Sequence, residues 1–249
     1  MKIIHYKQLA STNSHIKELL QSDYMLPHFT VVSADYQTSG RGQRENRWES
    51  CEGANLLFSM LLRPDELKAS DAFAISRIIS VAIAKWLASY IDNVSIKWPN
   101  DIYCGDKKIC GILIENSMIG MNISTSIVGV GININQTVFS PFIPNPTSLS
   151  LITGKSYKVE DVFYSVLSEI EKQYNNYFGG FSEEINALYH NMLYRLNIPS
   201  KYNVVNLFTS TKRAEEATIV GVESNGCLML KHSDESVCSY AFKEVEFII

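Results

Sequence analysis

VSIKWPNDIYCGDKKICGILIE, residues 94–115, is the stretch of sequence that decides the fold. Its two ends, VSIKW and ICGILIE, are short runs rich in Val and Ile, a composition that favours β-strands. Residues 104–108 between them contain a glycine and polar side chains, which is typical of a hairpin turn. The stretch therefore predicts strands on either side of a tight turn, with the polar segment KWPND at the end of the first strand.

Outward from this stretch, apolar patterns predict both strands and helices. Further strand-like runs lie at residues 29–35, 55–63 and 125–135, and a short strand opens the chain. Polar residues 11–14 are good helix N-caps, so a short helix is expected to begin there. Two longer helices show apolar residues at helical spacing, one opened by Ser70 and one running from Val162 to Phe178. Ser182 is expected to cap a final helix that extends to Leu193.

The character of the sequence changes after Pro199. Short β-type runs separated by turn residues fill residues 201–249, and Asn225-Gly226 is a hairpin-turn signal between two of them. This spacing predicts a small barrel-like β-domain. We therefore expect two domains, residues 1–197 and residues 198–249.

Composition narrows the class of protein. Of the 249 residues, 46% are hydrophobic and 19% charged, which excludes disorder over most of the chain. The net charge of −4 argues against a surface that wraps nucleic acid, because such surfaces carry a basic excess. No apolar run reaches the ~18 residues of a membrane span. The five cysteines include no CxxC pair and the N-terminus has no leader pattern, so we expect a reduced, cytoplasmic protein.

Several short motifs carry chemistry, and each also has a plain structural explanation. The loop GRGQRENRW, residues 40–48, offers guanidinium groups and backbone N–H groups to a carboxylate or phosphate, or is a solvated surface loop. Asn100 and Asp101 could hold Mg²⁺, or serve ordinary turn chemistry. Lys108 could neutralise an anion in a cleft, or be a solvated hairpin lysine. The common nucleotide fingerprints GxGxxG and GxxxxGK[ST] are absent.

Glycines in predicted strands form the remaining oddity. Gly111 interrupts ICGILIE, and Gly129 and Gly131 interrupt the run at residues 125–135. Glycine weakens a strand and often marks the close approach of a ligand or of another backbone. These three glycines predict a sheet face against which something flat is laid.

Taken in order, five segments resemble the biotin protein ligase family: STN (residues 11–13), GRGQRENRW (40–48), KWPND (97–101), KICGILIE (108–115) and GVGIN (129–133). The resemblance implies an α+β fold, in which a mixed β-sheet catalytic domain of the class II synthetase-like type is flanked by helices. A small C-terminal SH3-like β-barrel is implied to follow it.

The resemblance also implies an activity in two half-reactions. Biotin and ATP, with Mg²⁺, give biotinyl-5′-AMP and pyrophosphate, and biotin is then transferred to a lysine of a biotin carboxyl carrier domain. The resemblance is compatible with a homodimer. A lipoate–protein ligase and a non-catalytic biotin-binding regulator are the alternatives. Only ten residues precede Ser11, so no DNA-binding domain and no nucleic-acid partner are expected.

Site residues are implied by the same resemblance. Those implied to bind biotin are Ser11, Thr12, Asn13, Gln37, Gly40, Arg41, Lys108, Gly111, Gly129 and Gly131. Those implied to bind ATP are Gln43, Arg44, Asn46, Arg47, Trp48, Asn100 and Asn133. Catalysis is assigned to Lys108, Arg41 and Asp101, and a Mg²⁺ ion to Asn100 and Asp101, although Asp101 could instead assist the acceptor lysine.

The loop departs from the family pattern at two positions. Gln43 stands where many members carry Arg, so that Arg44 or Arg47 would have to take over one contact to the adenylate. Glu45 stands where a glycine is common. Because residues 36–53 contain few apolar side chains, we expect this loop to be mobile without ligand and to become ordered over biotin.

Overall fold

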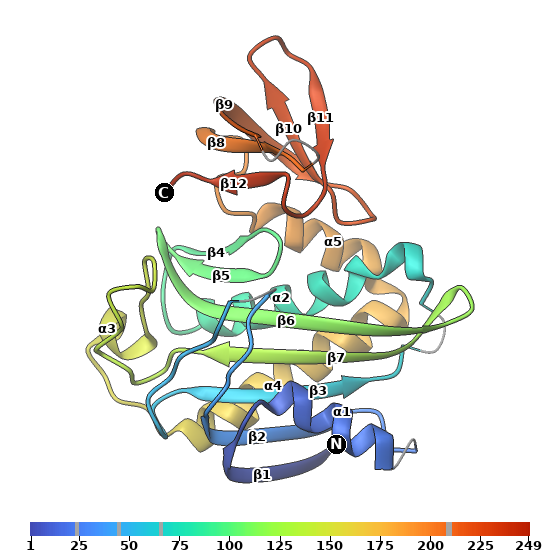
Figure 1. The fold of residues 1–249 in the computed structure, drawn as a ribbon, viewed down its shortest axis with the longest axis vertical. Helices are drawn as coiled ribbons and strands as arrows, with labels where there is room; N and C mark the ends of the chain where they lie inside the picture. The colour runs from blue at the N-terminus through green and yellow to red at the C-terminus, as the bar shows by residue number, and fades with distance from the viewer. Residues whose placement is uncertain (23–24, 44–45, 65–66, 208–210) are drawn as a thin grey trace.

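A seven-stranded mixed sheet forms the body of the protein (Figure 1). The computed structural model describes residues 1–22, 25–43, 46–64, 67–207 and 211–249. In spatial order the strands of this sheet are β1 (Lys2–Leu9), β2 (Thr30–Gln37), β3 (Leu56–Leu62), β7 (Asn122–Ile132), β6 (Lys107–Ile119), β5 (Asp101–Cys104) and β4 (Val94–Lys97). Only the β1–β2 pair is parallel, because residues 10–29 carry the chain back across the sheet through α1 (Thr12–Ser22).

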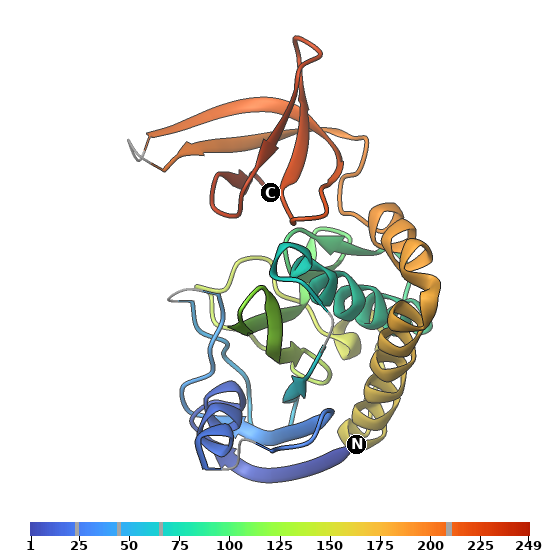
Figure 2. The ribbon, with the colours of Figure 1, turned by 90° about the vertical axis from the view of Figure 1, so that its right-hand side faces the viewer.

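Helices cover both faces of this sheet unequally. One face packs against α2 (Phe73–Ala88) and α4 (Val159–Asn176), which Figure 2 shows along one side of the molecule, and this interface forms the main apolar core. The other face carries α1 over β2 and β3, with a small core that contains Ile16. Loops cover the rest of that second face. A short helix, α3 (Leu149–Thr153), follows the proline-rich loop.

The strand pattern separates the two faces by residue type. In β7 the side chains of Val128, Val130 and Ile132 enter the main core, so the intervening Gly129 and Gly131 face the opposite way. The register pairs Gly111 of β6 with Gly131, and Ser59 of β3 with Gly129. Because side chains alternate along a strand, the second face carries small and polar residues at its centre, while the first face carries apolar residues.

A second, five-stranded antiparallel sheet follows the helices, as the sequence predicted. Its order is β11 (Val237–Tyr240), β10 (Leu228–His232), β9 (Thr211–Val222), β8 (Pro199–Asn206) and β12 (Val245–Phe247), so β11 and β12 are its two ends. The change of sheet falls at β8, and the domain boundary at residue 198 stays a prediction. The indole N–H of Trp98 donates to the carbonyl of Gly226 at 2.8 Å, so this sheet contacts the turn that follows β4.

Two predicted helix starts were wrong. Ser70 lies in a 3₁₀ turn, Ala69–Asp71, and α2 begins at Phe73. Ser182 is the first residue of α5 (Ser182–Asn191) and caps nothing, because the chain enters α5 through the π-helical turn Tyr177–Phe181 rather than from a loop. Gly180, at φ 102°, lies outside the helical region of φ and ψ. Because α4 ends at Asn176, Phe178 lies beyond it in the π-helical turn and is 42% exposed.

No helix among the described residues is long and apolar enough to cross a membrane.

Candidate functional site

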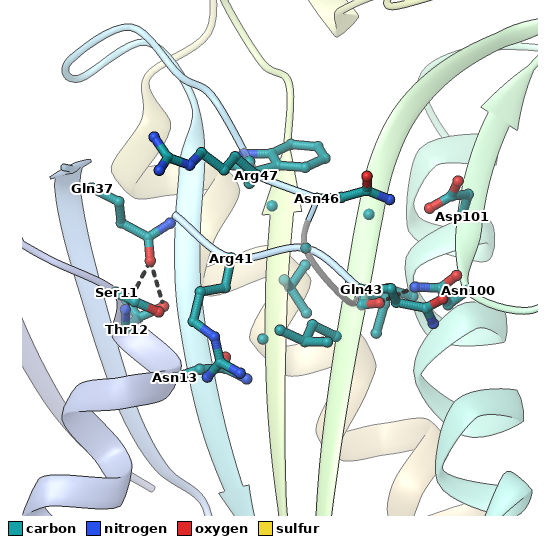
Figure 3. Close-up of a pocket in the computed structure, with 18 of the residues that line it drawn as sticks. Ser11, Thr12, Asn13, Gln37, Arg41, Gln43, Asn46, Arg47, Asn100 and Asp101 are labelled. Atoms are coloured by element: carbon teal, nitrogen blue, oxygen red, sulfur yellow. Dashed lines mark hydrogen bonds between the residues drawn. The ribbon is translucent and has the colours of Figure 1, made fainter. Parts of the chain in front are cut away.

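A cavity of about 130 Å³ lies on the small, polar face of the large sheet, beneath the loop that follows β2 (Figure 3). Its wall combines the start of α1, the end of β2, the loop, the first half of β6 and the end of β7. The predicted residues that line it are Ser11, Thr12, Asn13, Gln37, Arg41, Gln43, Asn46, Arg47, Trp48, Asn100, Asp101, Lys108, Gly111, Gly129 and Gly131.

One end of the cavity is built from neutral hydrogen-bonding groups at the start of α1. Thr12 and Asn13 are each only 3% exposed. The Thr12 backbone N–H donates to Gln37 Oε1 at 2.8 Å, and Thr12 Oγ1 lies 3.1 Å from the same oxygen, as Figure 3 shows. Ser59 of β3 reaches both residues, with Oγ 2.7 Å from Thr12 Oγ1 and 2.5 Å from Asn13 Oδ1.

Glu115 of β6 holds the loop against the sheet. Its carboxylate receives two hydrogen bonds from the Arg41 guanidinium, at 3.1 and 2.9 Å, one from Lys17 Nζ at 2.7 Å and one from Asn13 Nδ2 at 3.0 Å. Burial alone would raise the pKa of Glu115, but these hydrogen bonds and the charge of Lys17 outweigh it and lower the pKa to about 2. Glu115 is therefore ionised at neutral pH.

The strand glycines make room for side chains of the protein itself. A Cβ atom at Gly131 would lie 2.4 Å from Cε2 of Trp48, and one at Gly111 would lie 2.8 Å from Cζ3 of the same ring. A Cβ atom at Gly129 would lie 2.1 Å from Asn13 Oδ1. The flat group expected on this face is thus the indole of Trp48, whose buried N–H has no hydrogen-bond partner among the described residues.

Lys108 and Asp101 form an ion pair at the other end of the cavity, with Lys108 Nζ 2.7 Å from Asp101 Oδ1. The ammonium group also lies 5.7 Å from the centre of the Trp48 ring. Lys108 therefore points into the site, and the alternative of a solvated hairpin lysine is wrong.

A second cavity, of about 430 Å³, adjoins the first and shares Trp48, Asp101 and Lys108 with it. Lys97 adds a further cation to its wall, 4.6 Å from the centre of the Phe247 ring of β12. Burial is the main cause that lowers the pKa of Lys97, and Lys108 adds to the effect. Asn133 belongs to this second cavity rather than the first.

The groups expected to hold Mg²⁺ offer little besides one carboxylate. The Asn100 side-chain amide donates to the carbonyl of Ile112, and Asp101 is paired with Lys108. Among the residues that the structure describes, no three His, Cys, Asp or Glu side chains cluster as a metal site. This donor set fits an ion that keeps its waters and arrives on a phosphate ligand.

The remaining predicted residues lie nearby or outside the description. Gly40 does not line the cavity, but its carbonyl accepts from the Trp48 backbone N–H at 3.0 Å and closes the base of the loop. Arg44 and Glu45 lie outside the described residues, so the contact proposed for Arg44 stays a prediction.

Sequence reasoning missed Ser59, Glu115 and Lys97. Each had a signal in the sequence. Ser59 is the one polar residue in the apolar run LLFSMLL, Glu115 ends ICGILIE with a charge, and Lys97 opens KWPND. Their partners are distant in sequence, so the signals did not reveal which groups they contact.

The arrangement suits a ligand that is neutral and polar at one end and anionic at the other. Hydroxyl and amide groups surround one end, next to the Arg41–Glu115 ion pair, and Arg47 and Lys108 also line the first cavity. Cations fixed in a cleft stabilise an anionic ligand and any negative charge that develops as it reacts.

Comparison with known proteins gives the following matches. The model of the biotin/lipoate A/B protein ligase family matches residues 6–133. The bifunctional ligase/repressor BirA of Bacillus subtilis is 32% identical over 185 residues, which cover 70% of this chain and 54% of BirA. The biotin–[acetyl-CoA-carboxylase] ligase of Paracoccus denitrificans is 28% identical over 234 residues, covering 90% of this chain and 92% of that protein. The chain thus spans about half the length of the first curated relatives it matches.

A solved structure covers the whole fold. The R40G mutant of the biotin protein ligase from Aquifex aeolicus, in complex with biotin, superposes with a TM-score of 0.77 at 28% identity. The match covers 100% of this chain and 98% of that one, and therefore includes the C-terminal sheet.

Proposed function

This chain belongs to the biotin/lipoate A/B protein ligase family, and we propose that it is an ATP-dependent biotin–protein ligase. The observation that carries the proposal is a single cavity that combines neutral hydrogen-bonding groups at Thr12 and Gln37 with the cations Arg41 and Lys108, of which Lys108 lies at the opposite end with Asp101. Biotin has the matching shape, with a cyclic urea at one end and a carboxylate at the other. The biotin-bound Aquifex structure, similar over the whole chain, supports the same ligand.

In the first half-reaction we propose, a carboxylate oxygen of biotin attacks the α-phosphorus of ATP, and pyrophosphate leaves as the P–O bond to it breaks. Two anions must approach each other, so fixed positive charge is needed between them. Arg41 and Lys108 would supply it in the first cavity, and Arg47 and Lys97 would meet the polyphosphate in the second. Mg²⁺, held by the phosphates and Asp101, would offset the charge of the leaving pyrophosphate.

In the second half-reaction, the amine of an acceptor lysine attacks the acyl carbon of biotinyl-5′-AMP, an amide bond forms and AMP leaves. The amine must lose a proton in this step. Asp101, which lines both cavities and whose Oδ1 pairs with Lys108, would accept the proton. We propose a biotin carboxyl carrier domain as the acceptor, and we keep the predictions of a cytoplasmic location and of no nucleic-acid partner.

ATP–pyrophosphate exchange tests the proposal. The protein should exchange labelled pyrophosphate into ATP when biotin is present and not when lipoate replaces it, and it should then label a biotin carboxyl carrier domain at one lysine. Exchange with lipoate but not biotin would establish the lipoate–protein ligase instead. Biotin binding without exchange would establish a non-catalytic regulator.

A further inference from the structure

A continuous line of polar contacts runs behind the cavity, from the loop to β2. It passes from Arg41 to Glu115, then to Asn13, Ser59, Thr12 and Gln37, through the distances given above. Ser59 is fully buried, and Thr12 and Asn13 are nearly so. These groups must therefore satisfy one another, and the position of every proton matters.

The central contacts contain more oxygen pairs than hydroxyl protons. Three O···O contacts join Gln37 Oε1 to Thr12, Thr12 to Ser59, and Ser59 to Asn13 Oδ1. Each hydroxyl carries one proton, so Thr12 and Ser59 together can fill only two of the three contacts. One contact must be left without a proton, and the question is which one.

Glu115 decides this question. An ionised carboxylate only accepts, so the group that Asn13 turns toward Glu115 must be its NH₂, and Asn13 Oδ1 must face Ser59. Ser59 then donates to Asn13 Oδ1. The Thr12 hydroxyl can donate either to Ser59 Oγ, at 2.7 Å, or to Gln37 Oε1, at 3.1 Å. It donates to Ser59, because two oxygens without a proton between them repel more strongly at the shorter distance and Gln37 Oε1 already accepts the Thr12 backbone N–H. The contact left without a proton is the one between Thr12 Oγ1 and Gln37 Oε1, on the side of the cavity.

We propose that Glu115 is a positioning residue that sets the direction of these hydrogen bonds, so that Thr12 Oγ1 and Gln37 Oε1 are left as acceptors for an N–H donor of the substrate. The inference rests on the proposed function, since the N–H group is that of the biotin urea. The two acceptor oxygens lie 3.1 Å apart. Gln37 Oε1 accepts the Thr12 backbone N–H at 2.8 Å, and both oxygens keep a lone pair for the substrate donor.

Replacing Glu115 with glutamine would remove this constraint. The glutamine amide can donate, so Asn13 can rotate its side chain and turn its NH₂ toward Ser59. Ser59 would then donate to Thr12, and Thr12 to Gln37 Oε1, which fills all three contacts. Thr12 and Gln37 would then hydrogen-bond to each other and would no longer offer acceptors to the substrate.

A double-mutant cycle in the exchange assay separates this role from the ion pair between Glu115 and Arg41. Glu115→Gln should raise KM for biotin about tenfold with kcat little changed, the effect expected for one hydrogen bond in substrate binding. Ser59→Ala already interrupts the line of hydrogen bonds from Glu115 to Gln37. In that background Glu115→Gln should change KM less than about twofold, because residues that act through one network have non-additive effects. Ser59→Cys is the second background if the alanine variant does not fold, since a thiol of similar size hydrogen-bonds only weakly.

Lys17→Gln is the matched control. Lys17 pairs with the same carboxylate but does not belong to the line of hydrogen bonds from Glu115 to Gln37, so KM for biotin should stay within about twofold of the wild-type value. The inference is wrong if the wild-type protein exchanges with biotin and the effects of Glu115→Gln and Ser59→Ala on KM multiply in the double variant. Glu115 would then act through Arg41 or through its charge. A wild-type protein with no biotin-dependent exchange would overturn the proposed function, and this inference with it.

Discussion

Gly131→Ala should drive Trp48 out of the site. A Cβ atom there would lie 2.4 Å from Cε2 and 2.6 Å from Nε1 of the indole, about 1 Å closer than ordinary van der Waals contact. Neither partner can absorb this overlap. The indole is a rigid fused ring, and β7 is fixed between β3 and β6 by its ladder of hydrogen bonds.

The size of the effect follows from the surface that the indole loses. An aromatic side chain buries ~150–250 Å², and each Å² of apolar surface is worth ~25 cal/mol. Trp48 is half-buried, so displacing it should cost the closed loop about 2–3 kcal/mol. That shifts the ratio of closed to open loop by roughly 30- to 160-fold.

Limited trypsin digestion measures this shift, because Arg41 and Arg47 are cleavage sites within the loop. Cleavage there should accelerate in Gly131→Ala, and tryptophan fluorescence should move to longer wavelength as the indole meets water. Gly179→Ala is the control, since a Cβ atom at Gly179 would meet no atom within 4 Å. Unchanged cleavage and fluorescence in Gly131→Ala would refute the reasoning.

A second comparison tests the role that the family resemblance gives to the glycine. In a Trp48→Ala background, Gly131→Ala should have no further effect on biotin-dependent exchange if its purpose is to admit the indole. A further loss would show that biotin itself lies against Gly131.

Three other outcomes are expected. Lys108→Ala should lower biotinyl-5′-AMP formation at least ~10²-fold, the cost of one preorganised charge-stabilising group, while Lys107→Ala, exposed in the neighbouring position, should be near normal. Because the folded pKa of Glu115 is about 2, below its unfolded value, its ionised form stabilises the fold above pH ~4.5, and this contribution is lost as the pH falls toward 2. The difference in unfolding free energy between wild type and Glu115→Gln should therefore be larger at pH 7 than near pH 2 in denaturant titrations. Replacing Arg44 and Arg47 together with alanine should let biotinyl-5′-AMP escape and label a bystander protein, whereas unchanged labelling would show that Gln43 needs no compensation.

The sequence by itself indicated most of the elements and their order, but not β5 between VSIKW and ICGILIE, nor the short helix α3. Runs such as VSIKW and ICGILIE become β4 and part of β6, because β-branched residues in short apolar runs favour strands whatever their neighbours. The change of character after Pro199 coincides with the start of β8 and the second sheet. The order of five short motifs indicated the family, since each motif is read from adjacent residues.

The sequence was less informative about where the helices begin. The π-helical turn before α5 and the 3₁₀ turn before α2 depend on how each helix packs, and Ser182 and Ser70 look like N-caps in either case. Local propensity cannot distinguish a cap from the first turn of a helix that continues from another.

Only the tertiary structure decided which groups meet in the site. Arg41 pairs with Glu115, 74 residues later, and Ser59 contacts Asn13, 46 residues earlier. The strand glycines admit Trp48 and Asn13, where the sequence indicated only that something flat approaches. The physical reason is that a strand's periodicity fixes which residues share a face, but the pairing of strands into a sheet fixes which distant side chains lie above that face.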